Sequence, residues 1–547
     1  MKLLYVAVSV LVLTILSFLL FPGYTYLQSD TQIYIPILER FWDPSVFEHD
    51  IVATRPHVAF TIYDEVTIGL RRITGLEFQH ALVIQQFAFR ALGIVGVYLI
   101  ATAAALPVPM ALFAGAAYTL GATILGPSVL TVEYEAVPRG FTVPMVLLAT
   151  GLCANGRVMA GAVAGAFGSM YHPPTLYPFA IVFLLFSAWR RELRALVVFL
   201  TGPALLLLSS RVQMGLLEPQ DFFGVVDAEL EQLQRMRASY NWVSVWIGRY
   251  FWHYAVLVAG GLLAYWRVRQ HVRPELKPFI LGLPLVGVLS VPLSYIFMDL
   301  VKWSLMPQLQ PARALLFVVV MAVILFVAAG VHAGLKRRWI ESALWFLPVF
   351  AVPSQPFFFQ VLWRDLSNPV IRTRALVVLS LALLAALAMW IHSRWPRWSP
   401  AALAVATVLP FFALPHLAQS RNYPPLHHSE LDALASWART STPKDAVFLF
   451  PDSDRNLVPG VFRARSLRSL YVDWKGGGQV NFLKNFAGDW WERWQRVMGN
   501  EFDPSAISRF RETGIDYVVL TPKNRLADQQ AVYENSGYLV YTTNGDE

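Results

Sequence analysis

The sequence predicts an α-helical protein that crosses a membrane many times and ends in a small α/β domain. The first observation is composition: of 547 residues, 56% are hydrophobic and 15% are charged, whereas an average soluble chain carries about 25% charged residues. The second is that apolar runs long enough to span a bilayer recur from Leu3 to about Ala418. The third is that beyond Ala418 the pattern changes to a capped amphipathic helix and short strands.

The distribution of basic residues argues against nucleic-acid binding. The net charge is +8, but the positive side chains occur in short clusters between apolar runs, as expected for cytoplasmic loops. Cys153 is the only cysteine, so the chain can form no internal disulfide and no Cys-based zinc site. We interpret Cys153 as an inert apolar residue. The run Leu3–Phe21 is not followed by a small-residue cleavage site, and we expect it to be retained as the first span.

A count of thirteen spans places every Lys/Arg cluster beside a short loop on one side of the membrane. Removing one span would invert the later clusters, so the N-terminus is predicted to be cytoplasmic and the C-terminus extracytoplasmic. The predicted spans are Leu3–Phe21 and about Ala81–Ala104, then spans ending near Gly126, Asn155, Tyr171, Arg190, Arg211, Arg267, Asp299 and Lys336, the short stretch Glu341–Pro353, and two spans ending near Arg394 and His416.

Two domains are predicted: a transmembrane domain, residues 1–417, and an extracytoplasmic α/β domain, residues 418–547. The transmembrane domain includes a long first outer loop, residues 23–79. The amphipathic segment Asp227–Tyr240 is expected to lie as a helix along the outer surface.

The α/β domain has a recognisable pattern of short elements. Strands are predicted at Ala446–Phe450, Asp516–Thr521 and Tyr538–Thr543. The stretch Phe482–Met498 is predicted as a helix, and its Trp side chains could form core or could offer flat faces to a sugar. The motif Tyr471-Val-Asp-Trp-Lys-Gly-Gly-Gly is dense in polar and aromatic residues, and its glycines indicate a loop.

Carboxylates at the outer rim of the membrane are candidates for function, because charges are costly to keep there. Asp30 lies in the motif SDTQIYIP after the first span, and it could act chemically or could only cap a helix. Glu133 and Glu135 lie on the loop between the third and fourth spans. In an extended segment their side chains would point the same way, which suits a divalent cation or a shared base. They could instead pair with Arg139 and only hold the loop.

Two further outer features carry polar side chains. His172 precedes Pro173 and Pro174, which leave it near the outer interface, where it could equally be a hydrogen-bonded interface histidine. Arg313, three residues after Gln310, stands at the outer start of the tenth span. A guanidinium there could bind phosphate oxygens in bidentate fashion, or it could be an ordinary interface arginine.

The layout resembles the GT-C superfamily of integral membrane glycosyltransferases. The resemblance rests on the first span with its acidic outer loop (SDTQIYIP and WDPSVFEHD), the acidic motif after the third span, about thirteen spans, an outer C-terminal domain, and the late Tyr-Val-Asp-Trp-Lys segment. It implies a GT-C-like fold. It also implies transfer of a sugar from a polyprenyl-phosphate donor to a saccharide, lipid or protein acceptor on the outer face of a bacterial inner membrane, with a periplasmic C-terminal domain. Membrane lipids are expected partners.

The resemblance implies roles for individual residues. The first-loop carboxylate, Asp30, would act as base or orient the acceptor. The second-loop carboxylates, Glu133 and Glu135, would hold a divalent cation such as Mg²⁺ or Mn²⁺, with Glu135 also a catalytic candidate. The lone Asp30 departs from the acidic pair common in that family. The remaining expected site residues are Arg313 and Arg139 for the donor phosphate, and His172, Tyr34, His57 and Gln310 for substrate.

Two other functions remain open from the sequence. A transporter or flippase of a lipid-linked saccharide would be expected to carry charges deep in its spans; the spans here are nearly free of acids at mid-depth, with Arg90 the main charged exception, which counts against this function. A non-catalytic scaffold or assembly protein would keep the fold without the chemistry, and the lone Asp30 is compatible with it.

Overall fold

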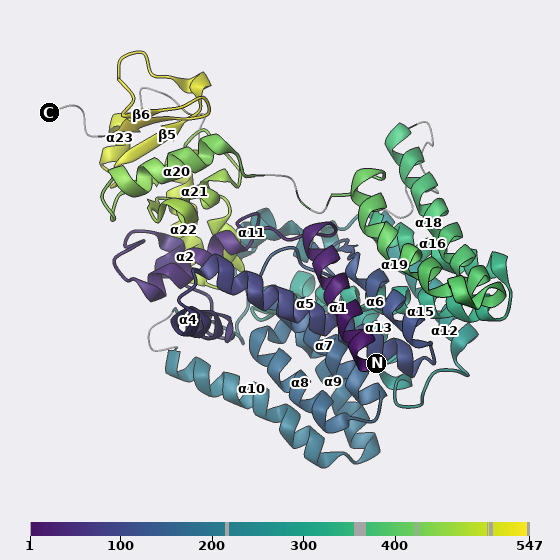
Figure 1. Cartoon of the computed structure of the whole chain (residues 1–547). Helices are drawn as coiled ribbons and strands as arrows, with labels where there is room; N and C mark the ends of the chain where they lie inside the picture. The colour runs from purple at the N-terminus through teal and green to yellow at the C-terminus, as the bar shows by residue number, and fades with distance from the viewer. Residues whose placement is uncertain are drawn as a thin grey trace.

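The computed structural model describes residues 2–213, 218–354, 368–421, 423, 426–499, 502 and 507–543. Figure 1 shows a helical body, which contains the N-terminus, and a smaller domain with strands that contains the C-terminal part of the chain. The last four residues of the predicted α/β domain, 544–547, lie outside the described residues.

Each of the thirteen stretches predicted as spans contains a helix, but the third, predicted to end near Gly126, is helical only as far as Thr119 and continues into the short strand β1 (Thr123–Ile124). Within the described residues, seven helices are long and apolar enough to cross a membrane by length and composition, and four shorter apolar helices of 10–17 residues accompany them. The predicted count of thirteen crossings therefore stays a prediction. The thirteen helices are α1 (Lys2–Leu19), α5 (Phe78–Ala103), α6 (Val108–Thr119), α7 (Pro138–Ala154), α8 (Val158–Tyr171), α9 (Pro173–Arg190), α10 (Leu193–Gln213), α12 (Gly248–Val268), α13 (Lys277–Ser294), α15 (Leu315–Leu335), α16 (Trp339–Ser354), α18 (Pro369–Arg394) and α19 (Ser399–His416).

Helix α15 forms the centre of the body. Nearly all of its side chains are buried, and it packs against α6, α12, α13 and α16, as expected of a helix that is apolar on all sides. Helices α5 and α7 approach closely because Gly96 faces α7. A Cβ on Gly96 would lie 2.4 Å from the backbone nitrogen of Leu148.

Arg90, the charged residue expected at depth, has a structural role. Its guanidinium donates to the backbone carbonyls of Ser17 at 2.7 Å, Gly23 at 3.1 Å and Glu133 at 2.8 Å. These carbonyls belong to the end of the first span, the first outer loop and the loop before α7. Arg90 therefore holds the two acidic loops against each other.

The first outer loop is largely helical. It contains α2 (Thr31–Trp42), α3 (Ile51–Thr54) and α4 (Tyr63–Thr74). Asp50 caps α3 by accepting hydrogen bonds from the backbone N–H groups of Val52 and Ala53. The helix predicted at residues 227–240 is confirmed as α11 (Ala228–Ala238), whose Leu230 N–H donates to the capping Asp227 side chain; its place on the outer surface stays a prediction.

The terminal domain is built on a five-stranded sheet. The strand order is β4-β3-β5-β7-β6; β3 runs parallel to β4 and β5, whereas β7 runs antiparallel to β5 and β6. In the β5–β7 register Val518 lies opposite Tyr541. The three predicted strands are confirmed as β3, β5 and β7. The elements are α20 (Ser429–Ser441), β3 (Val447–Leu449), α21 (Val458–Ser466), β4 (Ser469–Leu470), η6 (Gly476–Asn481), α22 (Lys484–Met498), α23 (Ile507–Arg511), β5 (Tyr517–Leu520), β6 (Tyr533–Glu534) and β7 (Leu539–Thr542).

Packing decides the role of the Trp-rich helix α22. Trp490 is fully buried, Trp494 is 6% exposed, and their ring centroids lie 5.6 Å apart. These two indoles form core, which was one of the two alternatives left open by the sequence. Trp490 Nε1 donates to the carbonyl of Asp473 at 3.0 Å, so the core also fixes the Tyr471–Gly478 motif.

The first outer loop and the terminal domain share one hydrophobic core. Ile33 and Ile37 of α2 and Ile51 of α3 belong to the same buried cluster as Trp490. Arg463 of α21 is 1% exposed and lies between Asp473, at 2.7 Å, and Asp50, at 3.7 Å. This buried ion pair places the terminal domain directly over the loop that carries Asp30.

Candidate functional site

Asp30 lies at the N-terminus of α2 and joins two distant parts of the chain. Arg139 Nη1, from the start of α7, donates to Asp30 Oδ2 at 2.6 Å, and Lys475 Nζ, from the terminal domain, donates to Oδ1 at 2.5 Å. The Asp30 side chain accepts no capping hydrogen bond from the described backbone N–H groups of α2. Burial acts to raise the pKa of Asp30, but Lys475 and Arg139 outweigh it and hold the pKa well below its usual range. Asp30 is therefore a carboxylate at neutral pH.

Glu133 extends this ion-pair network. Arg139 Nε donates to Glu133 Oε1 at 2.7 Å and Nη2 donates to Oε2 at 3.4 Å. The guanidinium of Arg139 thus lies between two carboxylates, and the four charges of Glu133, Arg139, Asp30 and Lys475 alternate in sign. Because the two negative and two positive charges balance, the partly buried cluster carries no net charge, which lowers the cost of its burial.

Glu135 fixes the segment that carries Asp30. Its carboxylate accepts hydrogen bonds from the backbone N–H groups of Gln28 at 2.5 Å, Ser29 at 2.7 Å and Thr31 at 3.2 Å, and from the Thr31 hydroxyl at 2.8 Å. Hydrogen bonds to a charged acceptor are the stronger kind. Glu135 therefore positions Asp30 from across the site.

The two second-loop carboxylates do not fit the expected divalent cation. Glu133 forms an ion pair with Arg139, and the Glu135 carboxylate accepts hydrogen bonds from backbone N–H groups of residues 28–31. Among the described residues no group of three His, Cys, Asp or Glu side chains could hold a metal ion. A cation at this place would need ligands that are already engaged elsewhere.

Three of the expected substrate residues line one cavity. Tyr34, His57 and His172 surround a space of about 220 Å³ together with aromatic side chains that include Phe482 of the terminal domain. His57 Nδ1 lies 2.8 Å from Gln479 Oε1, and its ring stacks on Phe482 with the centroids 4.7 Å apart. Burial lowers the pKa of His57. The terminal domain therefore forms part of the cavity wall.

His172 is a neutral imidazole that ends one helix and begins the next. Its Nδ1 accepts a hydrogen bond from Thr175 N at 3.1 Å, which requires that the proton be on Nε2. Burial lowers the pKa of His172 well below its usual value, and the nearby charges of Arg313 and Arg139 lower it further. The His172 Nε2–H group is therefore a donor at neutral pH.

Arg313 has no hydrogen bond or ion pair with another described side chain, and its Nε is buried without a partner. It lies in the short turn η4 (Pro311–Ala314), which follows α14 (Met306–Leu309) and Gln310, a residue with a left-handed backbone (φ 48°). Arg313 is near enough to lower the pKa of both Tyr34 and His172 electrostatically. Gln310 is 4% exposed and its amide oxygen also lacks a partner among the described residues, but it is not one of the residues that line the cavity.

An apolar groove lies along α15, the helix that follows Arg313. It has a volume of about 290 Å³ and lies between α12, α13 and α15. Val318, Ala322 and Leu325 of α15 line it. Val318 follows Arg313 by five positions, which is about 7.5–10 Å along the axis of η4 and α15, and Arg313 itself does not line the groove.

Lys475 is the functional candidate that sequence reasoning did not assign. The motif that contains it was noted for its density of polar and aromatic residues, but nothing local indicates that Lys475 contacts Asp30. The one signal in the sequence that could have pointed to Lys475 is that it ends the Tyr-Val-Asp-Trp-Lys segment, one of the motifs on which the resemblance to the GT-C superfamily rests. The contact itself spans 445 positions of sequence.

Along the chain, an apolar first helix is followed by an acidic loop, a second acidic loop before α7, a body of apolar helices and a C-terminal domain with a sheet, which is the order that the resemblance noted in the sequence predicts.

Comparison with known proteins gives one family match and structural similarities. A domain of unknown function (DUF6798) matches residues 429–497, and no curated protein matches the sequence. The fold is similar to that of ArnT from Cupriavidus metallidurans in the apo state, with 15% identity, 98% of each chain covered and a TM-score of 0.47. It is also similar to the Archaeoglobus fulgidus oligosaccharyltransferase tethered with an acceptor peptide, with 11% identity, 94% of this chain and 69% of that chain covered, and a TM-score of 0.43.

Proposed function

We propose that this protein is a membrane glycosyltransferase that moves a sugar from a polyprenyl-phosphate donor to an acceptor on the outer face of a bacterial inner membrane. The observation that carries the proposal is the position of Arg313. Its guanidinium has no partner among the described side chains. It influences the pKa of Tyr34 and His172, which line the aromatic cavity, and it precedes by five positions Val318, which lines the apolar groove. A lipid phosphate has the matching chemistry, because an anionic head adjoins a long apolar tail.

In this proposal the groove of α12, α13 and α15 holds part of the lipid tail, and Arg313 binds the phosphate. Arg139 already contacts Asp30 and Glu133, so we assign it to positioning Asp30 more than to direct phosphate binding. Glu135 holds residues 28–31 in place. Tyr34, His57 and His172 line the cavity where the sugar would lie, and the His172 Nε2–H group would donate to a sugar or phosphate oxygen.

The reaction is a displacement at the anomeric carbon. The acceptor hydroxyl oxygen forms a bond to that carbon, the bond from the carbon to the phosphate oxygen breaks, and the lipid phosphate leaves with the electron pair. The hydroxyl proton passes to Asp30, a transfer that contributes about 10²–10⁴-fold in typical enzymes. Arg313 offsets the charge that grows on the phosphate. Asp30 is a weak base while Lys475 contacts it, so the acceptor hydroxyl must replace Lys475 at Oδ1.

One observation favours a second candidate, a non-catalytic assembly protein. Both oxygens of Asp30 are engaged, one by Arg139 and the other by Lys475. A carboxylate held in this way could serve only to fasten the terminal domain to the first outer loop.

Native mass spectrometry of the detergent-released protein tests the donor site. Wild type, Arg313→Ala, Asp30→Asn and the control Arg397→Ala would each be incubated with polyprenyl phosphate or with phosphatidylglycerol. Arg397 is an exposed arginine of η5 (Pro396–Trp398), remote in sequence from the groove. We expect retention of polyprenyl phosphate to fall by about ten-fold or more in Arg313→Ala alone, because a charge-assisted phosphate contact is lost.

The outcomes separate the two candidates. Equal retention of polyprenyl phosphate and phosphatidylglycerol by wild type would contradict the donor site. Selective retention, followed by transfer from sugar-loaded donors that Asp30→Asn abolishes, would support the transferase. Selective retention with no transfer of any sugar tested, and with cells indifferent to Asp30→Asn, would favour the assembly protein.

A further inference from the structure

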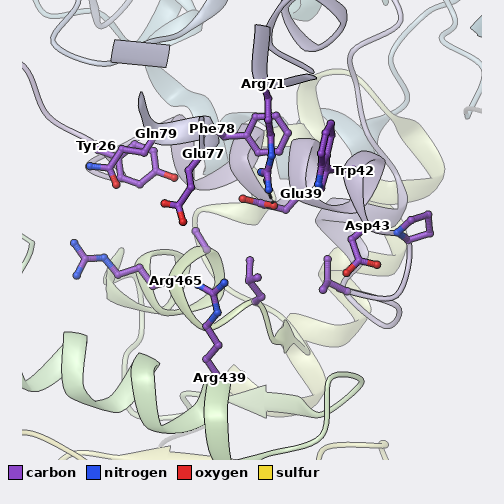
Figure 2. A pocket seen from close by; sticks show the side chains of 14 residues that line it. Tyr26, Glu39, Trp42, Asp43, Arg71, Glu77, Phe78, Gln79, Arg439 and Arg465 are labelled. Atoms are coloured by element: carbon purple, nitrogen blue, oxygen red, sulfur yellow. Dashed lines mark hydrogen bonds and ion pairs between the residues drawn. The ribbon is translucent and has the colours of Figure 1, made fainter. Parts of the chain in front are cut away.

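A second cavity, of about 720 Å³, lies between the first outer loop and the terminal domain. Figure 2 shows its lining side chains. One wall is formed by the end of α2 and the start of α5, and the other by α20 and α21. Glu39, near the end of α2, follows Asp30 by nine positions, about 13.5 Å along the helix. No residue that the structure describes lines both this cavity and the one lined by Tyr34, His57 and His172. This cavity is therefore separate from the candidate site described above.

The two walls carry opposite charges. Glu39 and Glu77 project from the wall of the first loop and α5, whereas Arg439 and Arg465 project from the wall of the terminal domain (Figure 2). No ion pair or hydrogen bond within the described part of the chain joins these two carboxylates to these two guanidinium groups. The carboxylates of one wall thus face the guanidinium groups of the other across the cavity without contact.

Two of these four side chains have no partner on either wall. Glu77 and Arg439 are exposed, and neither side chain makes a hydrogen bond or ion pair with another described residue. Glu39 pairs with Arg71 on its own wall at 3.1 Å. Arg465 contacts Asp432 and His427 of its own domain. The charges free to bind a ligand are therefore the carboxylate of Glu77 and the guanidinium of Arg439. Glu39 adds a second negative charge to the first wall, and Arg465 adds a second positive charge to the other.

The pKa of Glu39 responds to charges on both walls of the cavity. Burial raises the pKa of Glu39, Arg71 and then Arg439 act to lower it, and Glu77 raises it. Arg439 therefore influences Glu39 from the opposite wall without touching it. A ligand with a single negative charge would meet repulsion from Glu77, and one with a single positive charge would meet repulsion from Arg439. A ligand that carries both charges satisfies both walls.

We propose that this cavity binds a zwitterionic head group of the phosphoethanolamine type. The phosphate lies toward Arg439 and Arg465, because guanidinium groups bind phosphate oxygens in bidentate fashion. The ammonium lies toward Glu39 and Glu77, beside Tyr26, whose ring also lines the cavity and favours a nearby cation. The group could come from a free phosphoethanolamine or from a phospholipid at the outer leaflet. The inference does not depend on the proposed transferase activity.

Calorimetric titration of the full chain in maltoside detergent tests the proposal, with phosphoethanolamine, inorganic phosphate and ethanolamine as separate probes. We expect phosphoethanolamine to bind at least about ten-fold more tightly than either single-charge probe, since each charge contributes its own contact. Arg439→Ala and Glu77→Gln should each weaken it by about ten-fold or more. Glu77→Lys should reverse the preference toward inorganic phosphate.

Matched controls come from α23 and the turn that follows it. Arg509→Ala and Glu512→Gln change exposed residues of the same two types, and should leave the affinity unchanged. Because the Arg439 and Glu77 side chains are exposed and pair with no other residue that the structure describes, their variants should unfold at the wild-type temperature. Binding of phosphate alone as tightly as phosphoethanolamine, or binding that Glu77→Gln leaves unchanged, would overturn the proposal.

The source of the head group is decided in nanodiscs. If a phospholipid supplies it, nanodiscs of phosphatidylethanolamine should compete with added phosphoethanolamine, and nanodiscs of phosphatidylglycerol should not. Competition that Arg439→Ala removes supports a lipid head group. Equal affinity for phosphoethanolamine in both nanodiscs supports the free compound.

Discussion

Two lysines of the terminal domain bridge to the first outer loop, and their unequal burial predicts unequal contributions to docking. Lys475 Nζ lies 2.5 Å from Asp30, and the two side chains are 14% and 26% exposed. Lys444 Nζ lies 3.7 Å from Asp43, and these side chains are 64% and 44% exposed. Exposed pairs contribute about 0–1 kcal/mol, whereas breaking a fully buried pair costs about 3–5 kcal/mol. The Lys475–Asp30 pair lies between these limits, so we expect about 2 kcal/mol for Lys475→Met.

Hydrogen exchange of the segment around Lys475 measures this contribution. The turn η6 (Gly476–Asn481) begins next to Lys475, and Gly478 N donates to the Lys475 carbonyl at 2.9 Å. Local opening of this segment must break the contact with Asp30, so a loss of about 2 kcal/mol should accelerate exchange about 30-fold. Lys444→Met is the matched control and should accelerate exchange less than about five-fold.

The double variant tests whether the effect belongs to the ion pair. Asp30→Asn should accelerate exchange of the same segment, and Lys475→Met combined with Asp30→Asn should do little more than either change alone. Unchanged exchange in Lys475→Met, or the same acceleration in Lys444→Met, would refute the reasoning that burial makes this contact strong.

Two further predictions concern stability. The folded pKa of His172 lies well below the usual value of 6.5, so the unfolded chain binds more protons below pH 6.5. The stability that neutral His172 provides is fully present above pH 6.5 and is lost as pH falls toward the folded pKa, by up to about 1.4 kcal/mol per pH unit. His172→Gln should flatten the fall of the melting temperature between pH 6.5 and 5; an unchanged slope would count against a buried neutral imidazole. Gly96→Ala should destabilise the packing of α5 on α7 by about 1–3 kcal/mol, because its Cβ would lie 2.4 Å from Leu148 N. In thermal unfolding, Gly69→Ala is the control, since its Cβ would meet nothing within 4 Å, and equal melting temperatures for the two variants would contradict the close approach.

The sequence by itself determined the class of the protein and the position of its helices. Apolar runs of span length and the change of pattern near Ala418 are local properties, because the bilayer and the backbone act on each segment separately. The same local reasoning found the candidate residues Asp30, Glu133, His172 and Arg313, since charges and prolines beside an apolar run are conspicuous in any window of sequence.

Only the tertiary structure decided what these residues contact. Glu135 was expected to share a cation with Glu133, but its hydrogen bonds go to the backbone of residues 28–31. Lys475 reaches Asp30 across 445 positions, and the walls of the second cavity join residues of α2 and α20. Such contacts depend on how two separately folded surfaces dock, and no periodicity or spacing within one segment encodes that geometry. The sequence could therefore indicate where charges are costly, whereas the packing of the terminal domain on the first outer loop decided which of them meet.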